Sequence, residues 1–295
     1  MTRWTPRVAV CVPVHRDGAR LDRLLTAIRA TRWPADHLDV VVALDGPDPK
    51  LAAVAAAHGA EAVALSTRSG SYAARNCALD HLMDDVEVVV FTDADCIPRS
   101  GWLEAHVRAL EEGHLSGGAV DVTVRPAASP AEFVDRVRHL NQQAYVTEQG
   151  YAATANLAVR REVAGLRFNG RLRSGGDAEF CRRATSLGYR LMYTPAAIVE
   201  HPARTTAWDV LRKVRRIGRG IEGRPEYWTH QPTPTVKVRR WLAHRARREG
   251  VSRGRLWEVR AIALDFLAGA WIARSVRRAK RHAGPPAHAT LGYRR

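Results

Sequence analysis

The feature that most constrains this chain is a set of continuous apolar runs, rich in valine, spaced through its first hundred residues. Such runs are typical of strands buried on both faces of a parallel sheet. Between them, apolar residues recur at helical spacing, as at Leu21, Leu24, Leu25 and Ile28. The strands expected from the runs are Val8–Val14, Val40–Leu44, Ala62–Leu65 and Val86–Thr92. This alternation predicts an α/β fold with an open, doubly wound, mostly parallel Rossmann-like sheet whose ligand lies at the carboxyl ends of the strands.

Beyond these runs, the sequence predicts two more strands and two more helices before its composition changes near Thr205. The strands are Gly117–Val124 and Ala153–Val159, and the helices are Ala131–Tyr145 and Gly175–Leu187. Thr206 and Asp209 form a capping-box pattern at the start of an amphipathic helix, and a second such helix is expected from about Leu256 to Arg281. We therefore divide the chain into a main domain, residues 1–204, and a basic amphipathic helical extension, residues 205–295.

The net charge of +16 is confined to the extension. Residues 1–204 hold 24 Lys and Arg and 24 Asp and Glu, whereas residues 205–295 hold 22 basic and 6 acidic side chains. Such an imbalance suggests an acidic partner, either an anionic membrane surface or nucleic acid. The tryptophans near the arginine clusters fit a peripheral membrane anchor, and the absence of a recognisable binding module makes nucleic acid the weaker reading. The remaining alternative is that the apolar faces pack on the main domain and the arginines are solvated.

No segment resembles a signal peptide, because Met1 to Arg7 is polar and leads straight into an apolar strand. The longest apolar stretch, Ala261 to Ala273, is too short to cross a bilayer and contains Asp265. The four cysteines form no C-x-x-C pair, so we expect buried thiols rather than disulfides or zinc ligands. We therefore expect a cytoplasmic protein, either free or peripheral on the inner face of the plasma membrane.

Two carboxylates at Asp93 and Asp95 follow directly on the clearest of the predicted strands, Val86–Thr92. In an extended segment, side chains two residues apart project to the same side, so both acids can face one ion. Mg²⁺ and Mn²⁺ favour oxygen ligands and commonly use one or two carboxylates together with substrate phosphates. The alternative is that these two acids only solvate a loop or cap the next helix.

Two further segments of the first hundred residues bear on a nucleotide ligand. Asp45 ends a strand and could accept a hydrogen bond from a nucleobase or ribose, although Asp-Gly-Pro is also good turn chemistry. A Gly- and Ser-rich stretch opens the helix before the Asp93 strand and carries Arg75 in its first turns. Arg75 could approach a diphosphate there, and a solvated surface arginine is the ordinary alternative.

Together these features resemble glycosyltransferase family 2 in both order and spacing, over roughly residues 7–204. The matching segments are Val10 to His15 with Pro13, Asp45, Ala74-Arg75-Asn76, Thr92 to Asp95, Asn156 to Arg161, Gly175 to Ala184 and Val199 to His201. The resemblance implies a GT-A-type fold, a nucleotide-sugar donor and a Mn²⁺ or Mg²⁺ cofactor.

The resemblance also implies roles for particular residues. It places Pro13, His15, Asp45, Arg75 and Asp93 at the nucleotide sugar, and Asp93, Asp95 and His201 at the metal. Asp177 takes the position of the catalytic base of inverting members, which removes a proton from the acceptor hydroxyl. The residues alone favour a different interpretation, in which Asp177 is a helix N-terminal acid stabilised by the helix dipole and His201 is a simple strand-end histidine.

The chain departs from the family pattern at three places. Gly176 stands where the family often has glutamate before the base, so any support from that glutamate is missing. Leu44 precedes Asp45 where paired acids are common. The Q-x-x-R-W motif of processive synthases is not intact, since only Arg240-Trp241 remains, which favours the addition of a single sugar.

We therefore expect an inverting, metal-dependent glycosyltransferase that moves one sugar from a UDP-, GDP- or dTDP-sugar to a hydroxyl-bearing acceptor. A lipid-linked or cell-envelope acceptor would suit a basic, membrane-facing extension. Two alternatives remain: a nucleotidyltransferase on a similar fold, and a non-catalytic membrane- or nucleic-acid-binding protein that retains a transferase-like domain.

Overall fold

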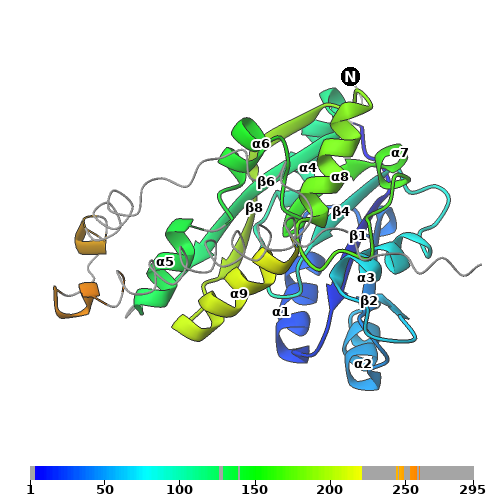
Figure 1. Cartoon of the computed structure of the whole chain (residues 1–295). Helices are drawn as coiled ribbons and strands as arrows, with labels where there is room; N and C mark the ends of the chain where they lie inside the picture. Colours follow the sequence, from blue (N-terminus) through cyan, green and yellow to red (C-terminus); the bar gives the residue numbers. More distant parts are fainter. Residues whose placement is uncertain are drawn as a thin grey trace, which may run out of the picture.

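The computed structural model describes residues 4–125, 129–138, 140–220, 244, 246–248, 253–257 and 259. Within these residues the chain forms one eight-stranded sheet with helices on both faces (Figure 1), in the strand order β3-β2-β1-β4-β7-β6-β8-β5. The α/β fold expected from the sequence is therefore confirmed.

The first half of the sheet is parallel. It consists of β1 (Val8–Val14), β2 (Leu38–Leu44), β3 (Glu61–Ala64) and β4 (Val88–Thr92). β1 lies at the centre and pairs with β2 along its whole length and with β4 from Val8 to Cys11. The carboxyl ends of β1, β2 and β4 consequently meet at one edge, which His15, Asp45 and Asp93 follow directly.

The second half of the sheet is mixed. β7 (Asn156–Arg160) runs antiparallel to both β4 and β6 (Leu115–Thr123). The long strand β8 (Leu191–Pro202) is parallel to β6, and the two-residue β5 (Ile97–Pro98) is antiparallel to β8. β7 thus reverses the strand direction beside β4, and β8 carries His201 to the same edge as Asp93.

Alternate strand residues pack against different helix layers, as expected of strands buried on both faces. Even-numbered residues of β1, β2 and β4 pack against α1 (Gly18–Arg29), α2 (Pro49–Ala57) and α4 (Trp102–Glu112). Odd-numbered residues pack against α3 (Ser71–Leu79), α7 (Arg161–Ala164) and α8 (Gly176–Ser186). All four cysteines are free thiols, and three of them are buried in these layers. The prediction of buried thiols without disulfides is thus confirmed.

The single helix predicted over Ala131–Tyr145 is wrong. The structure has two helices there, α5 (Pro130–Arg138) and α6 (Gln142–Gln149). Leu140 adopts a left-handed conformation, with φ of 57°, which a continuous right-handed helix cannot contain. The Asn141 side chain then caps α6 by accepting a hydrogen bond from the Ala144 N–H. Both helices contact β6, and α6 also contacts β8 whereas α5 contacts α9.

The helix expected after Thr206 is present as α9 (Ala207–Gly220), and the Thr206 hydroxyl accepts the Asp209 N–H as the capping pattern predicts. Its Val210 is buried in a cluster with Ala131, Phe133 and Val134 of α5, so α9 lies against α5 (Figure 1). The cluster also contains Ala246, Leu256 and Val259. This part of the extension therefore packs on the rest of the protein.

Most of the second amphipathic helix, predicted from about Leu256 to Arg281, lies outside the described residues, and the division at residue 204 stays a prediction. Among the described residues, none of the helices combines the length and the apolar character needed to span a bilayer.

Candidate active site

Asp93, Asp95 and His201 come together at the carboxyl edge of the sheet. Asp93 follows β4 directly, Asp95 lies two residues further on, and His201 is near the end of β8. One ligand atom from each side chain lies within 4.8 Å of those of the other two. Two carboxylates and one imidazole at this spacing form a donor set that fits Mn²⁺ or Mg²⁺, with positions left over for a substrate oxygen.

The hydrogen bonds of His201 direct one ring nitrogen at this cluster. Its Nδ1 lies 2.9 Å from the Pro202 carbonyl oxygen, which can only accept, so Nδ1 carries the proton in the neutral ring. The Nε2 lone pair is then free, and Nε2 lies 3.6 Å from Asp95 Oδ1. A backbone carbonyl that fixes the tautomer in this way is the usual support of a metal-binding histidine.

Each of the two acids also has an arginine partner. The Arg75 guanidinium donates to Asp93 Oδ1 at 2.5 Å, and that of Arg20 to Asp95 Oδ2 at 3.5 Å. Arg75 is only 2% exposed, and its Nε has no hydrogen-bond partner among the described residues. A buried N–H without a partner is costly, so Nε is a ready donor for an anionic ligand beside Asp93.

Asp177 lies in the first turn of α8, which begins after Gly175 in a left-handed conformation. Its Oδ1 accepts hydrogen bonds from the Tyr72 hydroxyl at 3.2 Å and from the Ala178 N–H at 3.0 Å. Desolvation by burial raises the pKa of Asp177, and these two bonds, together with the charge of Arg75, partly oppose that shift. A carboxylate held in this way is suited to accept a proton.

The ring of Tyr72 explains why position 176 is a glycine. A Cβ at Gly176 would lie only 2.7–2.9 Å from three carbons of that ring, closer than real Cβ atoms come to neighbours. The space that a side chain before Asp177 would use is therefore already filled from α3. The support that the sequence suggested was missing comes instead from the Tyr72 hydroxyl.

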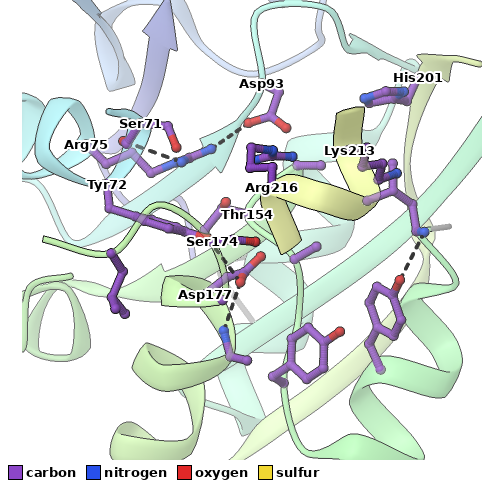
Figure 2. A pocket seen from close by; sticks show the side chains of 18 of the residues that line it. Ser71, Tyr72, Arg75, Asp93, Thr154, Ser174, Asp177, His201, Lys213 and Arg216 are labelled. Carbon is purple, nitrogen blue, oxygen red and sulfur yellow. Dashed lines mark hydrogen bonds and ion pairs between the residues drawn. The ribbon is translucent and has the colours of Figure 1, made fainter. Parts of the chain in front are cut away.

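One cleft of about 260 Å³ is lined by Asp93, His201 and Asp177, together with Tyr72 and Arg75 (Figure 2). Asp93 and His201 lie on one side and Asp177 on the other, with Arg216 between them in this view. The volume is near the lower limit of about 300 Å³ for small-molecule pockets, so the cleft suits one compact polar group. Lining residues that the sequence analysis did not single out include Tyr72, Thr154, Ser174, Arg204, Lys213 and Arg216. Of these, Lys213 and Arg216 could have been found as the polar face of the capped helix after Thr206.

Asp45 and His15 line a different pocket, of about 360 Å³, together with Pro47 and Arg68. Asp45 Oδ1 accepts the N–H groups of Ser69 and Gly70, both at 2.7 Å, and Oδ2 lies 3.7 Å from Arg68 Nε. One carboxylate oxygen therefore holds the loop that leads into α3, and the other lies beside the Arg68 guanidinium. Pro13 is buried in β1, where it pairs with Ala43 of β2, and is not among the residues that line the described pockets.

Two asparagines of the family-like motifs have structural positions. Asn156 is fully buried, with its amide nitrogen donating to the carbonyls of Ala119 and Ala197 and its oxygen accepting from Trp102 and His106. Asn76 makes two hydrogen bonds with the backbone of Phe168. These side chains join elements of the core and do not face the cleft.

Comparison with known proteins gives a consistent result. Residues 9–162 match the family model described as "Glycosyl transferase family 2". The chain is 30% identical over 229 residues to "Glycosyltransferase AglE" of Haloferax volcanii, covering 75% of this chain and 74% of that protein. It is also 30% identical over 222 residues to the "Pre-mycofactocin glycosyltransferase" of Mycobacterium tuberculosis, covering 68% of this chain but only 44% of that protein.

Solved structures with a similar fold include two glycosyltransferases. One is the mannosyltransferase PcManGT from Pyrobaculum calidifontis in complex with GDP-Man and Mn²⁺, with a TM-score of 0.57, 19% identity and coverage of 96% of this chain and 76% of that one. The other is GalNAc-T7 with UDP, GalNAc and Mn²⁺, with a TM-score of 0.55, 15% identity and coverage of 82% and 55%. At these identities the likeness concerns the fold.

Proposed function

The chain belongs to glycosyltransferase family 2, and from this premise we propose that it moves one sugar from a nucleoside-diphosphate sugar to an acceptor hydroxyl with inversion at the anomeric carbon. The observation that carries the proposal is the shared cleft, in which Asp177 faces Asp93 and His201 (Figure 2). A proton acceptor and an anion-stabilising cluster on opposite sides of one compact cavity are what a single displacement at carbon requires.

Asp93, Asp95 and His201 would hold a divalent cation, Mn²⁺ or Mg²⁺. When bound, the cation would offset the negative charge that gathers on the leaving nucleoside diphosphate. Support for this part comes from the donor set itself and from the two similar structures, which were determined with Mn²⁺ and nucleotide ligands. Arg75, with its unpartnered Nε, is placed to donate to the same diphosphate.

Asp177 acts as the general base. As the acceptor oxygen forms its bond to the anomeric carbon, its proton passes to the Asp177 carboxylate, and the bond from carbon to the diphosphate oxygen breaks with its electron pair on the leaving group. A single displacement of this kind inverts the anomeric configuration. The Tyr72 hydroxyl and the Ala178 N–H hold Oδ1, so the base is oriented before the acceptor arrives.

The nucleobase would lie in the pocket formed by His15 and Asp45 at the ends of β1 and β2. Asp45 Oδ2 is the atom placed to accept a base or ribose hydrogen, because Oδ1 already accepts two backbone N–H groups. The donor would be a UDP-, GDP- or dTDP-sugar. Attachment of the segment after residue 204 to an anionic membrane surface stays a prediction, as does a cytoplasmic location.

The test begins with a thermal-shift screen of UDP-, GDP- and dTDP-sugars with and without Mn²⁺, because a ligand of the folded state raises its apparent stability. Donor turnover is then measured as release of the nucleoside diphosphate in Asp177→Asn. We expect turnover to fall roughly 10²–10⁴-fold, the contribution of a positioned base, while the donor-induced thermal shift is kept.

Glu179→Gln is the matched control, since it removes an acid from the same turn of α8, where Glu179 pairs with Arg183 outside the cleft. Undiminished turnover in Asp177→Asn, or an equal loss in Glu179→Gln, would remove Asp177 from its proposed role. Absence of any metal-dependent shift with all three donors would contradict the proposed donor class.

A further inference from the structure

Two cations of the cleft share one buried carboxylate. Arg204, just after β8, donates to Asp135 of α5 at 3.1 Å, and Lys213 of α9 lies 3.4 Å from the other oxygen of the same group. The side chains of Asp135 and Lys213 are only 2% and 9% exposed. Neither cation pairs with a second acid among the described residues. One of the two positive charges is therefore left without a compensating carboxylate.

Excess charge at a poorly hydrated position is unfavourable, and proteins normally compensate it. Burial lowers the pKa of Lys213 to about 7, and the neighbouring charge of Arg204 contributes to this shift. An anion bound to Lys213 and Arg204 would compensate this excess positive charge. These two cations are therefore suited to bind a negatively charged ligand.

The excess extends over the surface around Lys213. A second pocket, of about 470 Å³, adjoins the cleft and shares His201, Arg204, Lys213 and Arg216 with it. Among the described residues, seven cationic and four acidic side chains line the two pockets, and two more acids lie behind them, Asp135 beside Lys213 and Asp17 beside Arg20. The cations are Arg20, Arg75, Arg182, Arg204, Arg212, Lys213 and Arg216.

The donor alone does not account for these charges. Its diphosphate would be offset by the divalent cation at Asp93 and Asp95 and by Arg75, which pairs with Asp93. Lys213 lies instead on the side of the cleft formed by α9 (Figure 2), and Arg204, just after β8, lines the same two pockets. The cationic excess of this side remains available for a second anion, close to the Asp177 base that receives the acceptor's proton.

We propose that Arg204, Lys213 and Arg216 form a phosphate subsite for the acceptor, so that the sugar is added to a molecule that carries a phosphate group near its reactive hydroxyl. This inference rests on the proposed function, because it names the acceptor class of the same site. Each of these three cations can donate to phosphate oxygens, and all three line both pockets.

A phosphate can belong to a free small molecule or to a lipid headgroup, and one feature bears on the difference. Trp208, in the first turn of α9, is 54% exposed, and the Arg212 guanidinium lies over its ring at 5.6 Å. Arg212 also lines the second pocket. An exposed tryptophan beside arginines is typical of contact with a lipid interface, so the test includes both sources.

The experiment uses the full chain saturated with Mg²⁺ and with UDP, GDP or dTDP, so that the positions of the donor phosphates are filled. Methyl phosphate is titrated by calorimetry, and cosedimentation is measured with phosphatidylcholine vesicles with and without phosphatidic acid. Lys213→Gln and Arg216→Gln are compared with Arg108→Gln, an exposed residue of α4 that removes the same charge away from the cleft. Lys213→Gln leaves Arg204 paired with Asp135, so it is expected to fold.

We expect methyl phosphate binding to weaken about tenfold in each cleft variant, as for the loss of one charged hydrogen bond, with nucleotide affinity and Arg108→Gln unchanged. Binding only to vesicles that contain phosphatidic acid, lost in the same variants, also supports the subsite and identifies a lipid source. Phosphate binding that both variants leave intact, or that the nucleotide abolishes, overturns the proposal. Failure of UDP, GDP and dTDP alike to bind would count against the proposed function, while the phosphate titration still decides the subsite.

Discussion

Gly176→Ala is a small change at a position that contacts Tyr72 and precedes Asp177, the proposed base. The new Cβ would lie 2.7, 2.8 and 2.9 Å from three carbons of the Tyr72 ring. That ring is buried and lies 5.8 Å from the Phe168 ring in a stacked arrangement. The backbone of Gly176 is helical and has no positive φ, so alanine can adopt it and the effect arises from the collision alone.

The size of the effect follows from the distances. Carbon atoms in contact prefer separations of about 3.5 Å or more, so the ring must retreat by roughly 0.8 Å. The Tyr72 hydroxyl now lies 3.2 Å from Asp177 Oδ1, and the retreat takes it beyond hydrogen-bond distance. Overpacking is expected to lower the free energy of unfolding by about 1–3 kcal/mol. Loss of the hydrogen bond to the carboxylate costs about 1.5–3 kcal/mol, which corresponds to at least a tenfold loss in kcat/KM if the base is misplaced.

The pH dependence gives the sign of the effect on Asp177. The Tyr72 hydroxyl lowers the pKa of this acid by donating to its ionised form, so loss of the bond raises that pKa further. The acid limb of the kcat/KM profile for transfer should therefore move to higher pH in Gly176→Ala. Tyr72→Phe should move the limb in the same direction, without the overpacking cost.

A double-mutant cycle isolates the collision. Tyr72→Leu removes the ring, so Gly176→Ala in that background should cost little, and the coupling free energy measured by urea unfolding should exceed about 1 kcal/mol. A wild-type pH profile and unfolding free energy in Gly176→Ala would refute the reasoning. An unchanged cost of Gly176→Ala in the Tyr72→Leu background would do the same.

Two further predictions concern stability. Burial lowers the pKa of His106 to about 4, so the folded state resists protonation that the unfolded chain accepts near pH 6.5. The contribution of neutral, buried His106 to stability is therefore complete above pH 6.5. The unfolding free energy should fall by about 3 kcal/mol as the pH drops from 6.5 through 4. Urea unfolding should show a smaller fall in His106→Gln. Asp93→Ala, measured in EDTA, should destabilise the fold by about 3 kcal/mol because it leaves the buried Arg75 without its acid. Asp95→Ala should cost less than about 1 kcal/mol, since Arg20 is exposed, and equal costs would contradict this explanation.

The parallel half of the sheet could be predicted because local sequence decides it. Valine runs buried on both faces have few alternatives, and β1 has the predicted bounds, Val8–Val14. The direction of β7 could not be predicted, because an apolar run looks the same whichever way its neighbours run. β8 was recognised only at Val199–His201, since most of its length is exposed or half-buried and its register against β6 shifts between Gly118 and Ala119.

In the candidate site too, some features could be predicted from local sequence and others could not. Acids at strand ends are visible in a sequence because the chain direction places them at one edge, as with Asp93 and Asp95. Contacts between distant elements are not visible: Tyr72 and Gly176 are explained only by the distance between α3 and α8. The role of Lys213 likewise depends on the packing of α9 against α5, which brings it to Asp135.

The two backbone hydrogen bonds of Asp45 link the pocket that it lines to the helix whose first turns line the cleft. The carboxylate anchors the peptide groups of Ser69 and Gly70, and Gly70 is the residue from which α3 starts. Tyr72 and Arg75 lie on the first turns of that helix. Their positions therefore depend on Asp45, which follows β2. Replacement of Asp45 would therefore disturb the proposed base pocket and the start of α3 together, so we expect changes of donor specificity to be tolerated better at residues around Asp45 than at Asp45 itself.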